Sequence, residues 1–72
     1  MAQQETATVI LRRKQVESKC GLARSTLYRR IAEGTFPGPI TLGEDGRAVG
    51  WIESEVNAWI NACVARRDRV AA

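Results

Sequence analysis

Histidine is absent from this 72-residue sequence, and so are a glycine-rich phosphate-binding loop and any long apolar run. Without histidine, the chain lacks the commonest general base and the commonest metal ligand. Only two cysteines occur, too few for a four-cysteine zinc site. The longest apolar run has four residues, far short of a membrane span or a signal-peptide core. We therefore expect no catalysis, no cofactor, no metal ion, no small-molecule substrate and no membrane.

The size and the cysteines fit a small protein of the cytoplasm. A chain of this length forms one domain with a modest core. Cys20 and Cys63 fall on apolar faces of expected helices, so we interpret them as reduced core residues in a cytoplasmic protein.

Charge is unevenly distributed along the chain. The formal net charge is +3, but residues 1–30 alone carry +5, residues 31–65 carry −4 and the last seven residues carry +2. If the first thirty residues form one face of the domain, that face is a candidate surface for a polyanion. The alternative is that these cations are solvated helix exteriors.

Glycine stops and apolar spacing predict two short helices near the start of the chain. The first runs from Arg12 to Cys20 and is followed by Gly21, a residue that accepts the positive φ often needed behind a helix. The second runs from Arg24 to Glu33. Two helices of this size with a short turn between them have the dimensions of a helix-turn-helix.

A hairpin and a third helix are predicted after them. Residues 40–42 and 47–51 are short apolar runs on either side of a turn that contains Asp-Gly, as in a β-hairpin. A helix beginning near Glu53 is predicted by four apolar residues at i, i+3, i+4 and i+7: Val56, Trp59, Ile60 and Cys63. The expected fold is thus mainly α with a small β-hairpin, in the order helix, helix, hairpin, helix. We place this domain at residues 9–66, between flexible tails at 1–8 and 67–72.

The second predicted helix carries the side chains that a DNA reader needs. With Leu27 at the centre of its buried stripe, Ser25 and Arg29 point the opposite way, and Thr26 and Tyr28 lie on the shoulders. Arginine can pair with guanine edges, serine and threonine with phosphates or base edges, and tyrosine with phosphate. The predicted DNA-binding residues of this helix are Arg24, Ser25, Thr26, Tyr28, Arg29 and Arg30.

Cations elsewhere extend this candidate surface. Arg12, Arg13 and Lys14 open the first helix, where they either touch a neighbouring phosphate or are solvated. Arg47 is the single basic residue between positions 31 and 65. It either enters a minor groove or stays solvated or paired beside its acidic neighbours. We add Arg13, Lys14 and Arg47 to the predicted DNA-binding set.

The remaining aromatic and basic residues are expected to have structural roles and not to bind DNA. Phe36, Trp51 and Trp59 have apolar neighbours, so we expect core positions rather than stacking platforms for nucleic-acid bases. The basic run at 66–69 is interpreted as a solvated helix end.

Three stretches of the sequence resemble the AlpA family of phage-type regulators. They are residues 21–29 (GLARSTLYR), residues 33–37 (EGTFP), and residues 47–59 with their RAVGW and ESEV strings. The resemblance covers roughly residues 10 to 62 and implies a winged helix-turn-helix similar to those of excisionases and MerR-like proteins. It also implies that residues 24–33 are the recognition helix and residues 42–49 the wing. At Ala23 the family usually has serine, and alanine forfeits ~1 kcal/mol of N-cap stabilisation.

The expected function is sequence-specific binding of double-stranded DNA by a prophage-type transcription regulator. RNA polymerase or integrase is a candidate further partner, together with weak self-association on DNA. One alternative is an excisionase that bends DNA and recruits integrase. An alternative of another class is a protein-interaction module such as an antirepressor, docking through residues 66–69 and the tryptophan-bearing helix.

Overall fold

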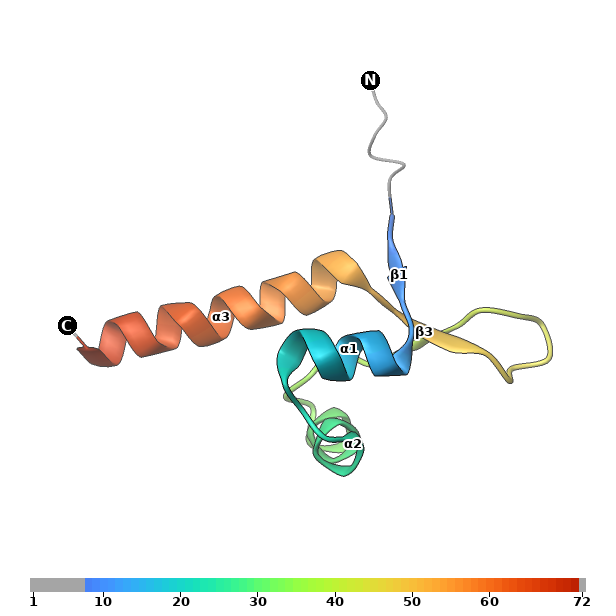
Figure 1. Ribbon diagram of the computed structural model, residues 1–72, viewed down its shortest axis with the longest axis horizontal. Coiled ribbons are helices and arrows are strands. Elements are labelled where there is room, and N and C mark those ends of the chain that lie inside the picture. Colours follow the sequence, from blue (N-terminus) through green and yellow to red (C-terminus); the bar gives the residue numbers. More distant parts are fainter. Residues whose placement is uncertain (1–7, 72) are drawn as a thin grey trace, which may run out of the picture.

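The computed structural model describes residues 8–71 and shows three helices with a small antiparallel sheet (Figure 1). In chain order, the elements are β1 (Ile10–Leu11), α1 (Arg13–Cys20), α2 (Arg24–Glu33), β2 (Ile40–Thr41), β3 (Val49–Ile52) and α3 (Glu53–Ala71). This is a winged helix-turn-helix, as the sequence predicts. The predicted tail at residues 1–8 lies almost entirely outside the described residues.

The helix-turn-helix consists of α1, a three-residue turn and α2. Gly21 adopts φ 70°, and its N–H donates a 2.8 Å hydrogen bond to the carbonyl oxygen of Glu17. Gly34 closes α2 in the same left-handed conformation, with φ 80°. Helix α1 begins at Arg13 rather than at the predicted Arg12, because Arg12 has extended backbone angles and occupies the N-cap position.

The sheet has one strand more than the predicted hairpin. Strand β3 is central and pairs antiparallel with both neighbours, giving the order β1-β3-β2. Ile10 lies opposite Ile52 in one pair, and Thr41 lies opposite Val49 in the other. The segment 42–48 between β2 and β3 forms the wing. The short apolar stretch before α1 is therefore a strand that ties the start of α1 to the base of the wing.

Gly50 permits the close approach of the strands. A Cβ atom built on it would lie 2.5 Å from Cγ2 of Ile10 and 3.2 Å from the backbone oxygen of Leu11. Both distances are tighter than ordinary contacts between carbon and its neighbours, so β1 and β3 can pair in this way only around a residue without a side chain.

The core lies where α1, α2, β3 and α3 meet. Its buried residues are Leu11, Val16, Leu27, Phe36, Trp51 and Val56. Trp51 is fully buried, and its Nε1–H donates a 3.0 Å hydrogen bond to the carbonyl oxygen of Pro37. The expectation of core positions is confirmed for Phe36 and Trp51, whereas Trp59 is only half-buried.

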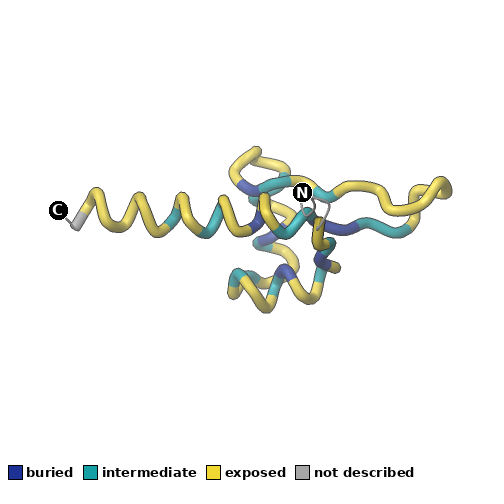
Figure 2. Tube along the Cα trace, turned by 90° about the horizontal axis from the view of Figure 1, so that it is seen from above, coloured by how far each residue is buried: buried dark blue, intermediate teal, exposed yellow. Residues whose placement is uncertain are grey.

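Helix α3 includes the basic run at 66–69, which the sequence analysis interpreted as a solvated helix end. It continues to Ala71, through the stretch predicted as a tail at 67–72, and its last two turns extend beyond the rest of the domain (Figures 1 and 2). No glycine or proline follows Arg66 to stop it, and Arg69 in the last turn has a favourable interaction with the helix dipole. Residues 64–70 are all exposed, so this end of α3 is a helix without tertiary support.

Candidate nucleic-acid interface

Helix α2 is fixed to the domain by one side and leaves its other side free. Leu27 is fully buried, and Ile31, one turn later, packs half-buried against the same core. Ala23 is the N-cap and forms no side-chain capping hydrogen bond, while its carbonyl oxygen accepts the N–H of Leu27 at 2.9 Å. The helix therefore begins where the sequence predicts, without the usual side-chain cap.

The outward side of α2 carries the residues that we expected there. Arg24, Ser25 and Arg29 are exposed, and Thr26 is half-buried on the shoulder. Arg29 lies 3.9 Å from the carboxylate of Glu33, with side chains 63% and 53% exposed. Such exposed pairs contribute ~0–1 kcal/mol, so the Arg29 guanidinium can exchange this partner for another.

Arg30 lies on a different side of α2 from Arg29. It is half-buried, and its Nε atom is buried without a hydrogen-bond partner among the described residues. Three residues after Leu27, it is only about 60° away from the buried stripe on a 100° helical wheel. The sequence analysis included Arg30 in the predicted DNA-binding set, and the structure places it beside the buried stripe rather than on the outward side of α2.

A second group of predicted residues meets between the start of α1, the middle of α2 and the base of the wing. They line an open hollow of about 350 Å³, which we call the cationic hollow: Arg12, Arg13, Lys14, Tyr28, Arg47 and Val49. Four of its six lining residues are cations, and none carries a negative charge. The antiparallel pairing of β1 with β3 brings residues 12–14 close to residues 47–49, which are more than thirty positions away in the sequence.

Two contacts orient the side chains of the cationic hollow. Arg13 donates a 2.7 Å hydrogen bond from Nη1 to the carboxylate of Glu17, one turn along α1. Tyr28 stands edge-on to the buried Trp51, with ring centroids 6.4 Å apart. Within residues 8–70, Arg12, Lys14 and Arg47 take part in no salt bridge, so three of the four cations are available to an external anion.

The wing carries acidic residues at its tip and the cation at its base. Glu44 and Asp45 are exposed, and Asp45 Oδ1 accepts the backbone N–H of Arg47 at 3.1 Å. This hydrogen bond holds the turn, and Arg47 is one of the residues that line the cationic hollow. The acidic tip is unsuited to deep insertion among phosphates, whereas the base of the wing is suited to contact them.

The family model described as prophage CP4-57 regulatory protein (AlpA) matches residues 9–64, nearly all of the described chain. The chain belongs to the AlpA family. It is similar to an uncharacterized protein of Enterobacteria phage P4, with 46% identity over 82% of this chain and 65% of that protein. It is also 37% identical to the DNA-binding transcriptional activator AlpA of Escherichia coli K12, over 78% of this chain and 86% of that protein. No solved structure matches the chain.

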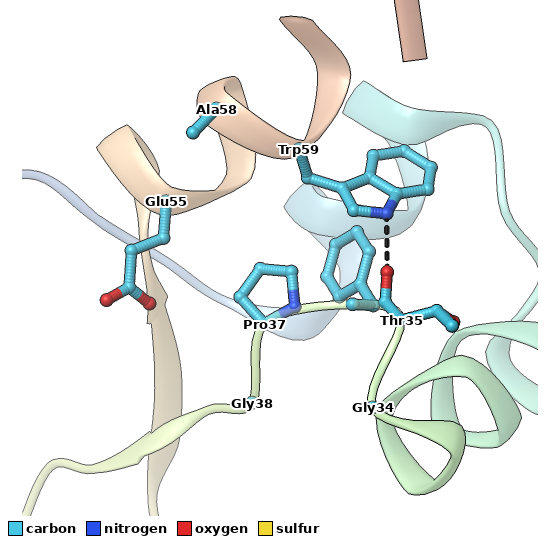
Figure 3. Close-up of a pocket in the computed structure, with 8 residues that line it drawn as sticks. Gly34, Thr35, Pro37, Gly38, Glu55, Ala58 and Trp59 are labelled. Atoms are coloured by element: carbon cyan, nitrogen blue, oxygen red, sulfur yellow. Dashed lines mark hydrogen bonds between the residues drawn. The ribbon is translucent and has the colours of Figure 1, made fainter. Parts of the chain in front are cut away.

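The AlpA fold also forms a concavity that the sequence analysis missed. Its lining consists of the segment 34–38 and three residues of α3, Glu55, Ala58 and Trp59, around a volume of about 560 Å³ (Figure 3). We call it the aromatic pocket, because Phe36 and Trp59 meet there edge-on with centroids 4.8 Å apart. The sequence analysis placed both rings in the core and therefore predicted no pocket here. The exposed Glu55, four residues before Trp59, is the feature of the sequence that could have indicated it.

Within the described part of this AlpA-family chain, no cluster of three or more potential metal ligands occurs, and no helix is long and apolar enough to cross a bilayer. Cys20 and Cys63 are free thiols and both are half-buried. Burial raises the pKa of the Cys20 thiol, with a smaller opposing effect of Lys19, so Cys20 is a poor nucleophile.

Proposed function

We propose that this AlpA-family chain is a sequence-specific duplex DNA-binding protein that acts as a prophage-type transcription regulator. The observation that carries the proposal is the cationic hollow beside the outward face of α2. Three cations that have no ion-pair partner among the described residues lie next to a short helix that projects arginine and serine away from the core. The name of the E. coli relative, a DNA-binding transcriptional activator, supports the same function.

In the proposed complex, α2 lies in the major groove and the cationic hollow grips the adjacent phosphate backbone. Ser25 and Arg29 face the base edges, where arginine can form a bidentate pair with guanine. Residues 12–14 and Arg47 contact phosphates on the two sides of the hollow, and Tyr28 can donate its hydroxyl to one of them. Arg24, at the start of α2, is placed toward the backbone rather than the bases. The wing lies beside the groove with its acidic tip turned away from the phosphates.

Arg30 has a subordinate part in this arrangement. Because its guanidinium Nε is already buried at the side of α2, only the outer end of the side chain can reach a phosphate. We therefore rank Arg30 and the half-buried Thr26 below Arg29 and Ser25 as determinants of sequence preference.

Selection from a random duplex library tests binding and specificity together. We expect the wild-type chain to enrich one motif, and Arg29→Ala to lose preference at one or two positions of that motif while still retaining bound DNA. Arg67→Ala is a matched control, because Arg67 lies near the end of α3 and pairs with Asp68. It should enrich the wild-type motif. Recovery of unenriched sequences by the wild-type chain would contradict the proposal.

A further inference from the structure

Helix α3 has an exposed face that runs along its whole length and differs from the face packed on the core. Val56 is buried, and Ile60 and Cys63 are half-buried on the core side. On a 100° helical wheel, a row of residues that are all exposed lies about 80–180° around the helix from Val56: Glu55, Ala58, Ala62, Ala65, Arg66 and Arg69. The aromatic pocket opens onto the first part of this row, since Glu55, Ala58 and Trp59 line it (Figure 3).

The charges on this face are arranged with opposite signs at its two ends. Glu55 stands at one end and Arg66 and Arg69 at the other, and within residues 8–70 none of the three forms a salt bridge. Glu55 and Arg69 are each seven residues from Ala62, which is close to two helical turns in either direction. The face is therefore self-complementary when a second copy of the same helix is laid against it in the opposite direction.

We propose that two copies of this chain pair through α3, antiparallel and centred on Ala62. Glu55 of each copy then lies opposite Arg69 of the other, so that the twofold axis generates two ion pairs. Arg66 of each copy lies against Ala58 of the other, beside the indole of Trp59, where a guanidinium can stack. The exposed alanines at the centre allow the two helix axes to approach closely.

Two other observations favour a second copy as the occupant. The last two turns of α3 extend past the rest of the domain (Figure 2), and residues 64–70 are all exposed; short helix segments of this kind are marginal on their own in water. In the antiparallel pair, these turns pass over the aromatic pocket of the other copy and cover its apolar wall. The contact is isologous and closes at two copies, as in most symmetric homo-oligomers.

The pairing face does not overlap the cationic hollow. The hollow is lined by residues of α1, α2 and the wing, whereas the pairing face belongs to α3 and the segment 34–38. The proposed pairing does not require DNA, and a chain that does not pair could still have the proposed DNA-binding function. If both hold, two recognition helices related by a twofold axis would read an inverted repeat.

Sedimentation velocity of the full chain, without DNA and up to roughly millimolar concentration, tests the pairing. We expect a reversible monomer–dimer equilibrium. Glu55→Arg and Arg69→Glu should each shift the midpoint concentration at least about tenfold upward, because each brings like charges together at both ends of the interface. An equimolar mixture of the two variants should recover the wild-type midpoint, since each variant supplies the charge that the other lacks.

Arg67→Glu is the matched control for these variants. It reverses the same kind of charge near the same end of α3, but on the side away from the pairing face, and should leave the midpoint unchanged. Circular dichroism measures the helix content of each variant, and because Arg67→Glu and Arg69→Glu both place a carboxylate near the end of α3, any fraying caused by the helix dipole should be similar in these two variants. A wild-type chain that remains monomeric, or a dimer equally weakened by Arg67→Glu, would overturn the proposal, as would failure of the mixture to recover association.

Discussion

The cationic hollow and the aromatic pocket are built in similar ways but differ in chemistry. Each forms where the start of a helix meets an irregular segment: α1 meets the base of the wing in one, and α3 meets residues 34–38 in the other. The hollow is lined by four cations and no carboxylate, whereas the pocket is lined by one carboxylate, two aromatic rings and no cation. The comparison shows that one small domain can have two separate surfaces, one suited to a polyanion and the other to a protein partner.

The difference follows from the way in which the fold distributes charge. Most of the positive charge lies in the first thirty residues, and β1 carries the start of that segment to the base of the wing. Arg47, the single cation between positions 31 and 65, lies in the wing at the same place. The pocket is built entirely from the acidic middle of the sequence. Segregation along the chain thus becomes segregation between surfaces.

Of the changes predicted here, salt concentration should have the largest effect on the affinity of the cationic hollow for duplex DNA. If ~4–6 phosphates are neutralised, log K should fall against log salt concentration with a slope of about −3.6 to −5.4, because bound counterions are released. Duplex affinity would then fall about 10²–10³-fold between 50 and 200 mM salt. Fluorescence anisotropy titrations at several salt concentrations measure this slope. A flat dependence would remove the contrast between the two surfaces and favour the protein-interaction alternative.

Arg29→Ala should separate base reading from phosphate binding. Its guanidinium is held only by an exposed pair with Glu33, so the change should cost ~1–3 kcal/mol on the selected site and much less on random duplex. Anisotropy on selected and scrambled duplexes measures both losses.

Arg24→Ala is the control for the Arg29 measurement. We expect it to weaken binding to both duplexes by similar factors and to make the salt slope shallower by about one unit, as for a phosphate contact. Equal losses on both duplexes for Arg29→Ala would instead mean that α2 grips only the backbone.

Trp59→Phe should change the aromatic pocket and leave the cationic hollow unchanged. The change removes the 2.7 Å hydrogen bond from Nε1–H to the carbonyl oxygen of Thr35, which holds α3 against the segment 34–38. We expect a loss of ~1–2 kcal/mol in the free energy of unfolding, from the hydrogen bond and the smaller ring. Urea denaturation measures it, and duplex affinity at a temperature where both chains are folded should be unchanged. Loss of DNA binding in the folded variant would show that the two surfaces are coupled.

Ala23→Ser should give the smallest effect, and it should be stabilising. Ala23 occupies the N-cap of α2 without a side-chain acceptor for the free N–H groups, and a serine hydroxyl would supply one worth ~0.5–2 kcal/mol. Thermal unfolding with Ala23→Gly for comparison measures the gain. An unchanged midpoint would mean that the serine side chain does not reach those N–H groups.

The sequence predicted the elements whose signals are local. Gly21 and Gly34 end α1 and α2 as expected, and the apolar spacing around Val56 predicted α3. Strand β1 was harder, because two residues cannot show a period, and its partner lies about forty positions away. The basic run at 66–69 lies in α3 and is exposed, as the sequence analysis expected for a solvated helix end.

The candidate site was predicted residue by residue, but its assembly was not. Arg13, Lys14, Tyr28 and Arg47 were each singled out, yet only the pairing of β1 with β3 places them around one hollow. Arg30 was included in the predicted DNA-binding set as a residue that flanks the outward side chains, and its position next to the buried stripe partly covers it. The aromatic pocket depends on a tertiary contact between two rings that are 23 positions apart.

Gly50 has a consequence for genetic screens. Any side chain at this position would collide with Ile10 and with the backbone of Leu11, and would push β1 off β3. Because β1 leads directly into residues 12–14, the damage would be transmitted to the phosphate contacts that we propose for these residues. A saturation screen for lost operator occupancy would therefore recover position 50 as strongly as a contact residue, although it has no side chain to offer the DNA. Such a screen would identify residues that position the arginines as well as the arginines themselves.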